Sequence, residues 1–439
     1  MNQYKKYFPW LKGFLFNGAI ATTASLSLVA PISGNSVFAA LQNSPKNVVD
    51  EAWQIVNREY VDRNFNQVDW QAKRKELLSR NYTSNEQAYE AIRQALEPLG
   101  DPYTRFLDPE NFQALTNQTA GELSGVGIRL EVNEENKTLS IVEPIENSPA
   151  FKAGLKTGDN IEEIDGKSTK GMTIKEASAL IRGEVGTSIT LKISRQGAEP
   201  FDVMLTRAQI QLPSVHYRFK QEGKMQVGYI SLDEFSSHAA EQMRQAIQEL
   251  KQKNVDAYVL DLRGNPGGLL HASIDIARMW LEQGAIVSTV DRIGGKQEFS
   301  ANQTSLTNLP LVLLVDEDSA SASEILTGAL KDNKRATVIG TQTFGKAAVQ
   351  SVHALSDGSG LAVTVSRYYP PSGIDITKKG ITPDIKLDLT QSQKQLLQNE
   401  PELIATKNDP QYQRALEILA NEVTPKPILG QTNEPSSVR

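Results

Sequence analysis

The chain has 439 residues and a formal net charge of −6, and hydrophobic and charged residues make up 39% and 22% of it. This composition predicts a globular protein of about two or three domains and excludes a collagen-like or wholly disordered chain. The negative charge gives no electrostatic reason to expect a nucleic acid partner. There is no cysteine, and the four histidines show no metal-ligand spacing, which argues against disulfides, a thiol nucleophile and a zinc site.

Residues 1–39 have the pattern of a signal peptide. Lysines near the start precede a mostly apolar run from Gly13 to Ala30, and small residues at 36–40 offer a signal-peptidase site. The apolar run is also nearly long enough to be an uncleaved membrane anchor. With either outcome, the rest of the chain is expected to be exported from the cytoplasm.

The next two regions differ in their periodicity. Apolar residues recur at three- and four-residue intervals in residues 44–119, which predicts a helical N-terminal region. The turn-rich segment Asp101–Pro109 interrupts it. Residues 120–208 contain short strand patterns punctuated by glycines, which predict a small mixed β domain. Residues 209–226 are expected to be a connector.

Residues 227–390 alternate between strand and helix patterns, which predicts an α/β domain. Apolar runs at 255–262 and 311–315 predict buried strands, and the segments 269–281 and 322–330 are predicted helices.

Two regions follow the α/β domain. A C-terminal helical segment is expected at 391–423, and the polar stretch 424–439 is expected to be disordered. The predicted fold class is therefore α/β plus a small β domain, with a helical N-terminal region.

The β domain carries a glycine-rich pattern in which Asn147–Leu155 leads into Gly158–Gly166. This pattern strongly resembles a PDZ domain of the kind found in proteases. The resemblance assigns the carboxylate-binding loop to Gly125, Val126, Gly127 and Ile128. Backbone N–H groups there would bind a chain-terminal carboxylate, and the following strand edge would accept the peptide as an added strand. The alternative is that these glycines are only turn residues.

Ser319–Glu324 contains three serines at the start of a predicted helix. A serine in this position lies beside unpaired N–H groups that stabilise negative charge. An oxyanion formed by attack of Ser321 can be held by the Ala322 N–H. The simpler interpretation is a capping box between Ser321 and Glu324. Spacing does not choose among Ser319, Ser321 and Ser323.

Lys346 lies further along the chain, in a glycine-bearing loop. A serine and a lysine can form a nucleophile pair that cleaves acyl bonds without histidine. Such a lysine must be neutral near pH 7, which requires burial, and its apolar neighbours Phe344 and Ala347 are compatible with that. Gln350 can orient the amine by a hydrogen bond. The alternative is an exposed loop lysine.

Three further patterns bear on the site. The segment Asp261–Gly268 has the pattern of a strand end, a turn and a helix start. Its glycines would let a backbone N–H act as a second oxyanion donor, and the alternative is that they form only a plain turn. Gly340–Lys346 spells a phosphate loop, but Ala347 follows where a Ser or Thr would hold magnesium. A triad based on His271 or His353 remains an alternative.

Together these motifs resemble the carboxyl-terminal processing proteases, the tail-specific serine peptidases that carry a PDZ domain. The resemblance covers nearly the whole chain after the signal segment and implies a crotonase/ClpP-like peptidase core. It implies that Ser321 is the nucleophile, Lys346 the general base and Gln350 the residue that orients the lysine. The oxyanion donors would be the N–H groups of Ala322 and Gly267.

The same resemblance assigns supporting roles to other residues. Asp332 and Arg263 would support the site, and Arg182 would couple PDZ ligand binding to activity. Many members have a glycine where this chain has Ala347, which leaves the conformation of the lysine loop open.

The implied function is an exported serine endopeptidase that cleaves near the C-terminus of protein substrates with exposed tails. No metal, cofactor or nucleic acid is implied, and membrane association would come through substrates. The chain looks most like cyanobacterial members, for which the periplasm or thylakoid lumen and the photosystem II reaction-centre precursor are the implied location and substrate. The alternatives are a catalytically silent PDZ adaptor that binds protein C-termini and a nucleotide-binding protein.

Overall fold

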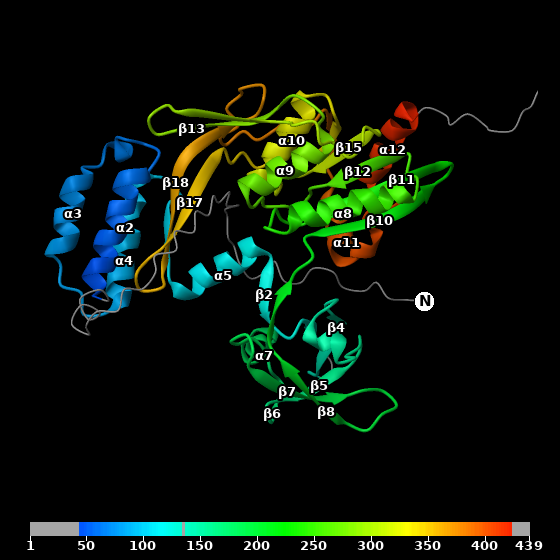
Figure 1. The fold of residues 1–439 in the computed structure, drawn as a ribbon, viewed down its shortest axis with the longest axis horizontal. Coiled ribbons are helices and arrows are strands. Elements are labelled where there is room, and N and C mark those ends of the chain that lie inside the picture. The colour runs from blue at the N-terminus through cyan, green and yellow to red at the C-terminus, as the bar shows by residue number, and fades with distance from the viewer. Residues whose placement is uncertain (1–43, 134–136, 424–439) are drawn as a thin grey trace, which may run out of the picture. The chain divides into compact units, whose positions relative to one another are not determined.

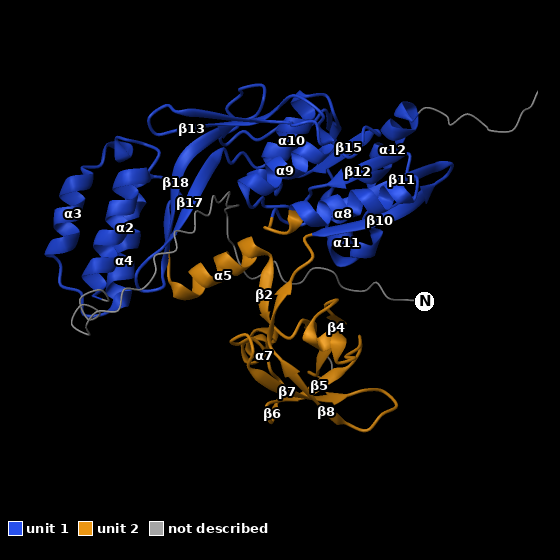
Figure 2. Ribbon diagram, viewed as in Figure 1, with its two compact units in different colours: residues 1–106, 215–235, 240–439 blue, residues 107–214, 236–239 orange. Residues whose placement is uncertain are grey.

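The computed structural model describes residues 44–133 and 137–423, so the predicted signal peptide and polar tail lie outside the described residues. The chain divides into two compact units, shown in Figure 2. The described part of the first unit comprises residues 44–106, 215–235 and 240–423. The second comprises residues 107–214 and 236–239.

The first unit is built on a six-stranded sheet with the order β10-β11-β12-β15-β16-β19 (Figure 1). β10 is antiparallel to β11, and every other neighbouring pair is parallel. The strands are β10 Val215–Glu222, β11 Met225–Leu232, β12 Ala257–Asp261, β15 Leu311–Val315, β16 Thr337–Gly340 and β19 Ile385–Lys386. Every residue of β12 and β15 is buried, as expected for parallel strands covered on both faces.

Helices cover both faces of this sheet. The last helix packs its buried Tyr412, Ala415 and Leu419 against Val312 and Leu314 of β15. On the other face, the Trp280 ring meets the Tyr258 ring edge-on at 5.3 Å. The helices of this part of the first unit are α8 Ala239–Gln252, α9 Leu270–Trp280, α10 Ala322–Asp332, α11 Gln391–Asn399, η4 Pro401–Leu403 and α12 Pro410–Glu422. The predicted α/β alternation and the C-terminal helices match these elements.

A second sheet in the same unit has the order β1-β18-β13-β14, with β17 also paired to β18. Its strands are β1 Arg105–Leu107, β13 Ala285–Asp291, β14 Lys296–Ser300, β17 Ala348–Ala354 and β18 Gly360–Tyr369. The N-terminal helices pack against β18 and share a core with Leu361 and Val363. These helices are α2 Pro45–Glu59, η2 Phe65–Gln67, α3 Trp70–Ser79, α4 Asn85–Leu96 and η3 Glu97–Leu99.

The second unit contains a sheet with the order β3-β4-β5-β7-β8, where β6 pairs with β5, and a two-stranded ribbon of β2 and β9. The strands are β2 Glu122–Gly125, β3 Ile128–Val132, β4 Leu139–Pro144, β5 Asn160–Ile164, β6 Lys167–Ser168, β7 Ser188–Ser194, β8 Phe201–Thr206 and β9 Ala208–Gln211. The helices are α5 Pro109–Ala120, α6 Pro149–Lys152 and α7 Ile174–Ile181. Residues 209–226, expected to be a connector, mostly form β9, β10 and the start of β11.

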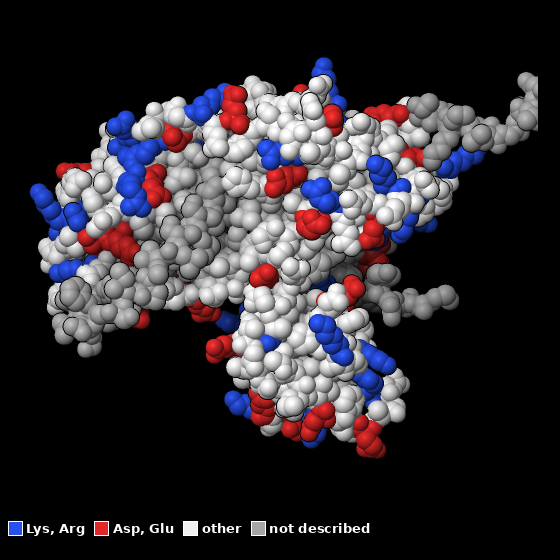
Figure 3. All heavy atoms as spheres, in the orientation of Figure 1, with Lys and Arg blue, Asp and Glu red and all other residues white. Residues whose placement is uncertain are grey.

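None of the helices within residues 44–133 and 137–423 is long and apolar enough to cross a membrane. On the face drawn in Figure 3, basic and acidic side chains are interspersed on the surface of each unit. The described surface on this face therefore has no large area of a single charge.

Candidate active site

Three loops of the first unit meet at one edge of the six-stranded sheet. They follow β12, β15 and β16, which are parallel neighbours, so their carboxyl ends lie at the same edge. Open α/β sheets carry their sites at this edge. The three loops contain Gly267, Ser321 and Lys346, which are far apart in the sequence.

Ser321 stands directly before α10 in a conformation that residues with a side chain rarely adopt. Its φ is 53° and its ψ is −111°. The side chain is fully buried, and its hydroxyl makes no hydrogen bond within the described part of the chain. Backbone strain of this kind is found disproportionately at functional sites.

The other two serines of the segment use their hydroxyls structurally. The Ser319 hydroxyl donates to the Leu262 carbonyl at 2.8 Å, and the Ser323 hydroxyl donates to the Asn265 carbonyl at 2.9 Å. Both bonds fasten the helix start to the loop after β12. Of the three serines, Ser321 is therefore the one whose hydroxyl has no such role.

Glu324 joins the serine segment to the lysine loop. Its buried carboxylate accepts from the Ser321 N–H at 3.0 Å, which is one half of the expected capping box. It also accepts from the Gly345 and Lys346 N–H groups at 2.7 and 2.8 Å and from the Thr343 hydroxyl at 2.6 Å. Burial raises the pKa of Glu324, although all four hydrogen bonds favour its charged form.

Tyr368 of β18 makes a second link between the same two segments. Its hydroxyl donates to the Ser321 carbonyl at 3.0 Å and also contacts the Lys346 carbonyl. The Tyr368 side chain is fully buried. Together, Glu324 and Tyr368 hold the backbone of Ser321 and Lys346 in one rigid arrangement.

Lys346 is buried, with 1% of its surface exposed. Its amine has no hydrogen-bond partner among residues 44–133 and 137–423, and it lies 4.6 Å from the centroid of the Tyr103 ring. Burial, followed by the positive charge of Arg105, lowers the pKa of Lys346 to about 7, while Asp101 and Glu324 act in the opposite direction. The amine can therefore be neutral near pH 7, as a general base requires.

Gln350 lies on β17, which begins just after Lys346. Its side-chain N–H donates to the Thr364 hydroxyl at 3.3 Å, and its amide oxygen makes no hydrogen bond with the described residues. The expected bond from Gln350 to the lysine amine is not formed in this structure. Gln350 is fully buried close to the lysine in sequence, so it remains a candidate to orient the amine.

The two expected oxyanion donors differ in whether their N–H groups are already hydrogen-bonded. The Ala322 N–H opens α10 and has no hydrogen bond with any residue that the structure describes. The Gly267 N–H instead donates to the Asn265 side-chain oxygen at 2.8 Å. Gly267 can serve an oxyanion only if the Asn265 side chain gives up this bond.

Arg263 supports the loop after β12. Its guanidinium binds Asp261, the neighbour two residues before it, and the Asp409 carboxylate at 2.8 and 3.0 Å. It also donates to the Gln411 amide oxygen at 2.9 Å. Although burial works against charge, Asp261 and Asp409 hold the pKa of Arg263 above its usual value. The start of α12 therefore anchors this loop, a link that the sequence analysis missed.

Asp332 is not beside Ser321, the predicted nucleophile. It ends α10, about 16 Å along the helix axis from Ser321, and accepts from the Ser372 N–H at 2.9 Å. The histidines are also engaged elsewhere, since the His271 ring packs against Phe299 and His353 lies 2.7 Å from Glu59. The segment after Lys346 is a strand, not the helix that a phosphate loop requires.

The expected peptide-binding residues lie in the second unit. Gly125 ends β2, and Ile128 begins β3, which is an outer strand of its sheet as the structure describes it. Val126 is buried and its carbonyl accepts from Ala150, whereas Gly127 has a φ of 79°. Exposed Arg182 follows α7 directly.

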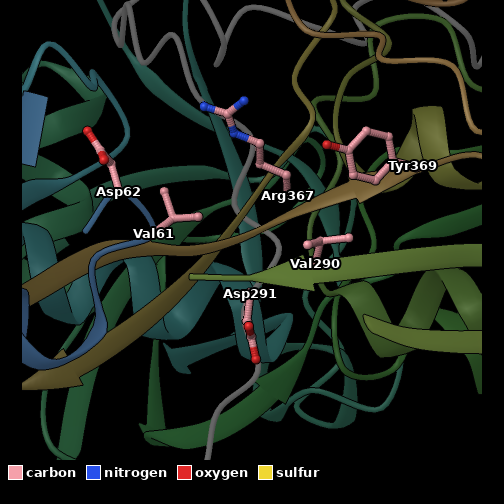
Figure 4. A pocket seen from close by; sticks show the side chains of 6 residues that line it. All are labelled: Val61, Asp62, Val290, Asp291, Arg367 and Tyr369. Carbon is pink, nitrogen blue, oxygen red and sulfur yellow. The ribbon is translucent and has the colours of Figure 1, made fainter. Parts of the chain in front are cut away.

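One described pocket of the first unit contains none of the predicted site residues. In Figure 4, Arg367 and Tyr369 extend from β18 to the same side of the strand. The lining residues are Val61, Asp62, Val290, Asp291, Arg367 and Tyr369. Among the described residues there is also no cluster of acidic residues and histidines suited to a metal ion.

Two family models match this chain. A model of peptidase family S41 matches residues 226–387, which contain the three loops described above. A PDZ domain model matches residues 140–195 of the second unit.

The chain is 42% identical over 392 residues to a carboxyl-terminal-processing protease of Synechocystis sp., with 89% of this chain and 90% of the relative covered. It is 40% identical to the chloroplastic carboxyl-terminal-processing peptidase 2 of Arabidopsis thaliana, with 76% and 67% covered. The solved structure of a photosystem II D1 C-terminal processing protease is similar, with 36% identity, a TM-score of 0.53, and 84% of this chain and 100% of that chain covered. The chain therefore belongs to the carboxyl-terminal-processing proteases of peptidase family S41, and it is a serine peptidase with a PDZ domain.

Proposed function

We propose that this protein is an exported endopeptidase that cleaves near the C-terminus of proteins by a Ser321–Lys346 pair. The observation that carries the proposal is that two buried polar groups without hydrogen-bond partners lie on loops tied to each other by the same side chains. The Ser321 hydroxyl and the Lys346 amine make no hydrogen bond with the described residues, and Glu324 and Tyr368 fix both backbones. Buried polar groups without partners are rare unless they await a ligand or a reaction.

In the proposed reaction, the neutral Lys346 amine takes the Ser321 hydroxyl proton as the oxygen attacks the scissile carbonyl. The Ala322 N–H stabilises the oxyanion, with the Gly267 N–H as second donor once Asn265 releases it. The Lys346 ammonium then gives its proton to the leaving amine, which leaves an acyl ester on Ser321. A water molecule, deprotonated by Lys346, hydrolyses this ester and frees the enzyme.

The PDZ domain would select the substrate by its free C-terminus. Outer strand β3 follows the glycine loop at 125–127, so an extended tail can pair with it while the loop N–H groups bind the carboxylate. The similarity to the solved photosystem II D1 C-terminal processing protease supports a role in processing that protein. The signal pattern of residues 1–39 supports the thylakoid lumen or periplasm as the location.

The test is cleavage of a tail-bearing substrate, followed by mass spectrometry. The substrates are the D1 C-terminal segment and an unfolded protein with an apolar tail. The parent should release a C-terminal fragment, and Ser321→Ala and Lys346→Met should not. Lys407→Met, the same change at an exposed lysine, should cleave as the parent does. Tail binding without cleavage by the parent would instead indicate an adaptor.

A further inference from the structure

The amine of Lys346 faces an aromatic ring from a distant part of the chain. Tyr103 precedes β1, in the turn-rich segment that joins the N-terminal helices to the second sheet. The centroid of its ring lies 4.6 Å from the Lys346 nitrogen. This amine has no hydrogen-bond partner among the described residues, and the ring face is the cation–π contact that the structure shows for it.

The backbone that carries the Tyr103 ring is held by its neighbours. The Tyr103 N–H and the Thr104 hydroxyl both donate to the Asp101 carboxylate, at 3.0 and 2.7 Å. The Thr104 hydroxyl in turn accepts from the Thr364 N–H of β18 at 3.0 Å. Thr364 also accepts from Gln350, so the segment that carries the ring and the predicted orienting residue share one anchor on β18.

The ring suits a base that changes its charge during the reaction. The face of an aromatic ring carries a partial negative charge and attracts an ammonium group. Asp101 and Glu324 also favour the protonated amine, whereas burial and Arg105 disfavour it. A ring attracts the cation without adding a full negative charge, so it can stabilise the ammonium that forms in the transition state and still leave the amine neutral in the resting enzyme.

We propose that Tyr103 is a positioning residue for the general base, whose ring face holds the Lys346 amine and stabilises the ammonium formed when Lys346 takes the Ser321 proton. This rests on the Ser–Lys mechanism proposed above. Tyr103 acts on the base and not on the substrate, so it affects kcat more than KM.

The test compares Tyr103→Phe, which keeps the ring face, with Tyr103→Leu, which removes it. Tyr103→Leu should lower kcat about 2- to 30-fold and leave KM within about twofold. The acid limb of its kcat/KM profile should move to lower pH by about 0.4 to 1.5 pH units, because the ammonium loses an attraction. Tyr103→Phe should behave as the parent does. Tyr82→Leu, at a similarly half-buried tyrosine bonded to the Leu77 carbonyl, controls for loss of an aromatic ring.

A readout independent of activity separates the two proposals. In protein labelled with ¹³C at the lysine Cε, the Lys346 signal, identified by its loss in Lys346→Arg, should titrate at lower pH in Tyr103→Leu than in the parent. An unchanged titration and rate in Tyr103→Leu, with Lys346→Met inactive, would overturn the role of Tyr103 alone. A shift to higher pH would also overturn it, because the ring would then serve only to exclude water. A parent that does not cleave would instead overturn the Ser–Lys mechanism.

Discussion

Replacing Glu324 with glutamine should separate the two segments of the proposed site. The carboxylate accepts four hydrogen bonds, two on each oxygen. One oxygen binds the Ser321 and Lys346 N–H groups, and the other binds the Gly345 N–H and the Thr343 hydroxyl. Glutamine has the same shape but presents one NH₂ group, which cannot accept. If the NH₂ group takes the place of the oxygen that binds Ser321 and Lys346, both of these N–H groups lose their acceptor. If it takes the place of the other oxygen, the Gly345 N–H loses its acceptor, while the Thr343 hydroxyl can turn and accept from the NH₂.

The expected loss in the free energy of unfolding follows from the number of hydrogen bonds lost. A buried donor left unsatisfied costs about 1–3 kcal/mol, so the loss of one or two N–H bonds costs about 1–6 kcal/mol. This is a large part of the total stability of a domain, about 5–15 kcal/mol. If the lost pair of bonds is that of Ser321 and Lys346, the backbone of both proposed catalytic residues is released. Because small displacements at a reacting centre can cost about 100-fold in rate, kcat should fall at least that much.

The assay combines urea unfolding with steady-state kinetics on a tail-bearing peptide. Glu324→Gln should lower the free energy of unfolding by the amount above, and it should lower kcat by about 100-fold or more if the Ser321 and Lys346 N–H groups lose their acceptor. Glu317→Gln makes the same change at an exposed carboxylate that pairs with Lys394, and it should cost less than about 1 kcal/mol. If Glu324→Gln retained the stability and the rate of the parent, the role of Glu324 in joining the two segments would be refuted.

Three other changes have expected outcomes. The pKa of Lys346 in the folded protein, about 7, lies below its ordinary value of 10.5, so the stability of the parent should rise with pH between these two values. Lys346→Met should abolish activity and remove this pH dependence of stability. Urea unfolding across pH should show that this variant is more stable than the parent by about 3 kcal/mol at pH 8. Asp409→Asn should remove an anion from the buried Arg263 and lower the free energy of unfolding by about 3 kcal/mol or more, as measured by thermal unfolding. Kinetics should show a parallel loss of kcat if the loop after β12 is displaced. Gly127→Ala should weaken the binding of a tail peptide, measured by calorimetry, because the added Cβ would come 2.2 Å from the Cβ of Ser148. Gly125→Ala is the control and should bind as the parent does, because the space beside Gly125 is open.

Features that depend on residues close together in the sequence could be predicted, and features that depend on residues far apart could not. The strands and helices of the core are predictable because their apolar periodicities are local, as the fully buried run of β15 illustrates. Spacing cannot choose among the three serines, because the choice depends on carbonyls in the loop after β12 that bind the hydroxyls of Ser319 and Ser323. Tyr368 and Asp409 carry no local signal, since each meets its partner only after the chain has folded.

The bond between Arg263 and Asp409 has a consequence for the order in which the site matures. Asp409 follows Ser321 and Lys346 in the sequence, so the ribosome makes both proposed catalytic residues before the anion that anchors the loop after β12. Until α12 docks, the Arg263 guanidinium has only Asp261 to neutralise it, and the loop lacks its second support. A chain still being synthesised therefore lacks one support of the loop that carries Gly267, the proposed second oxyanion donor, until the final helix folds.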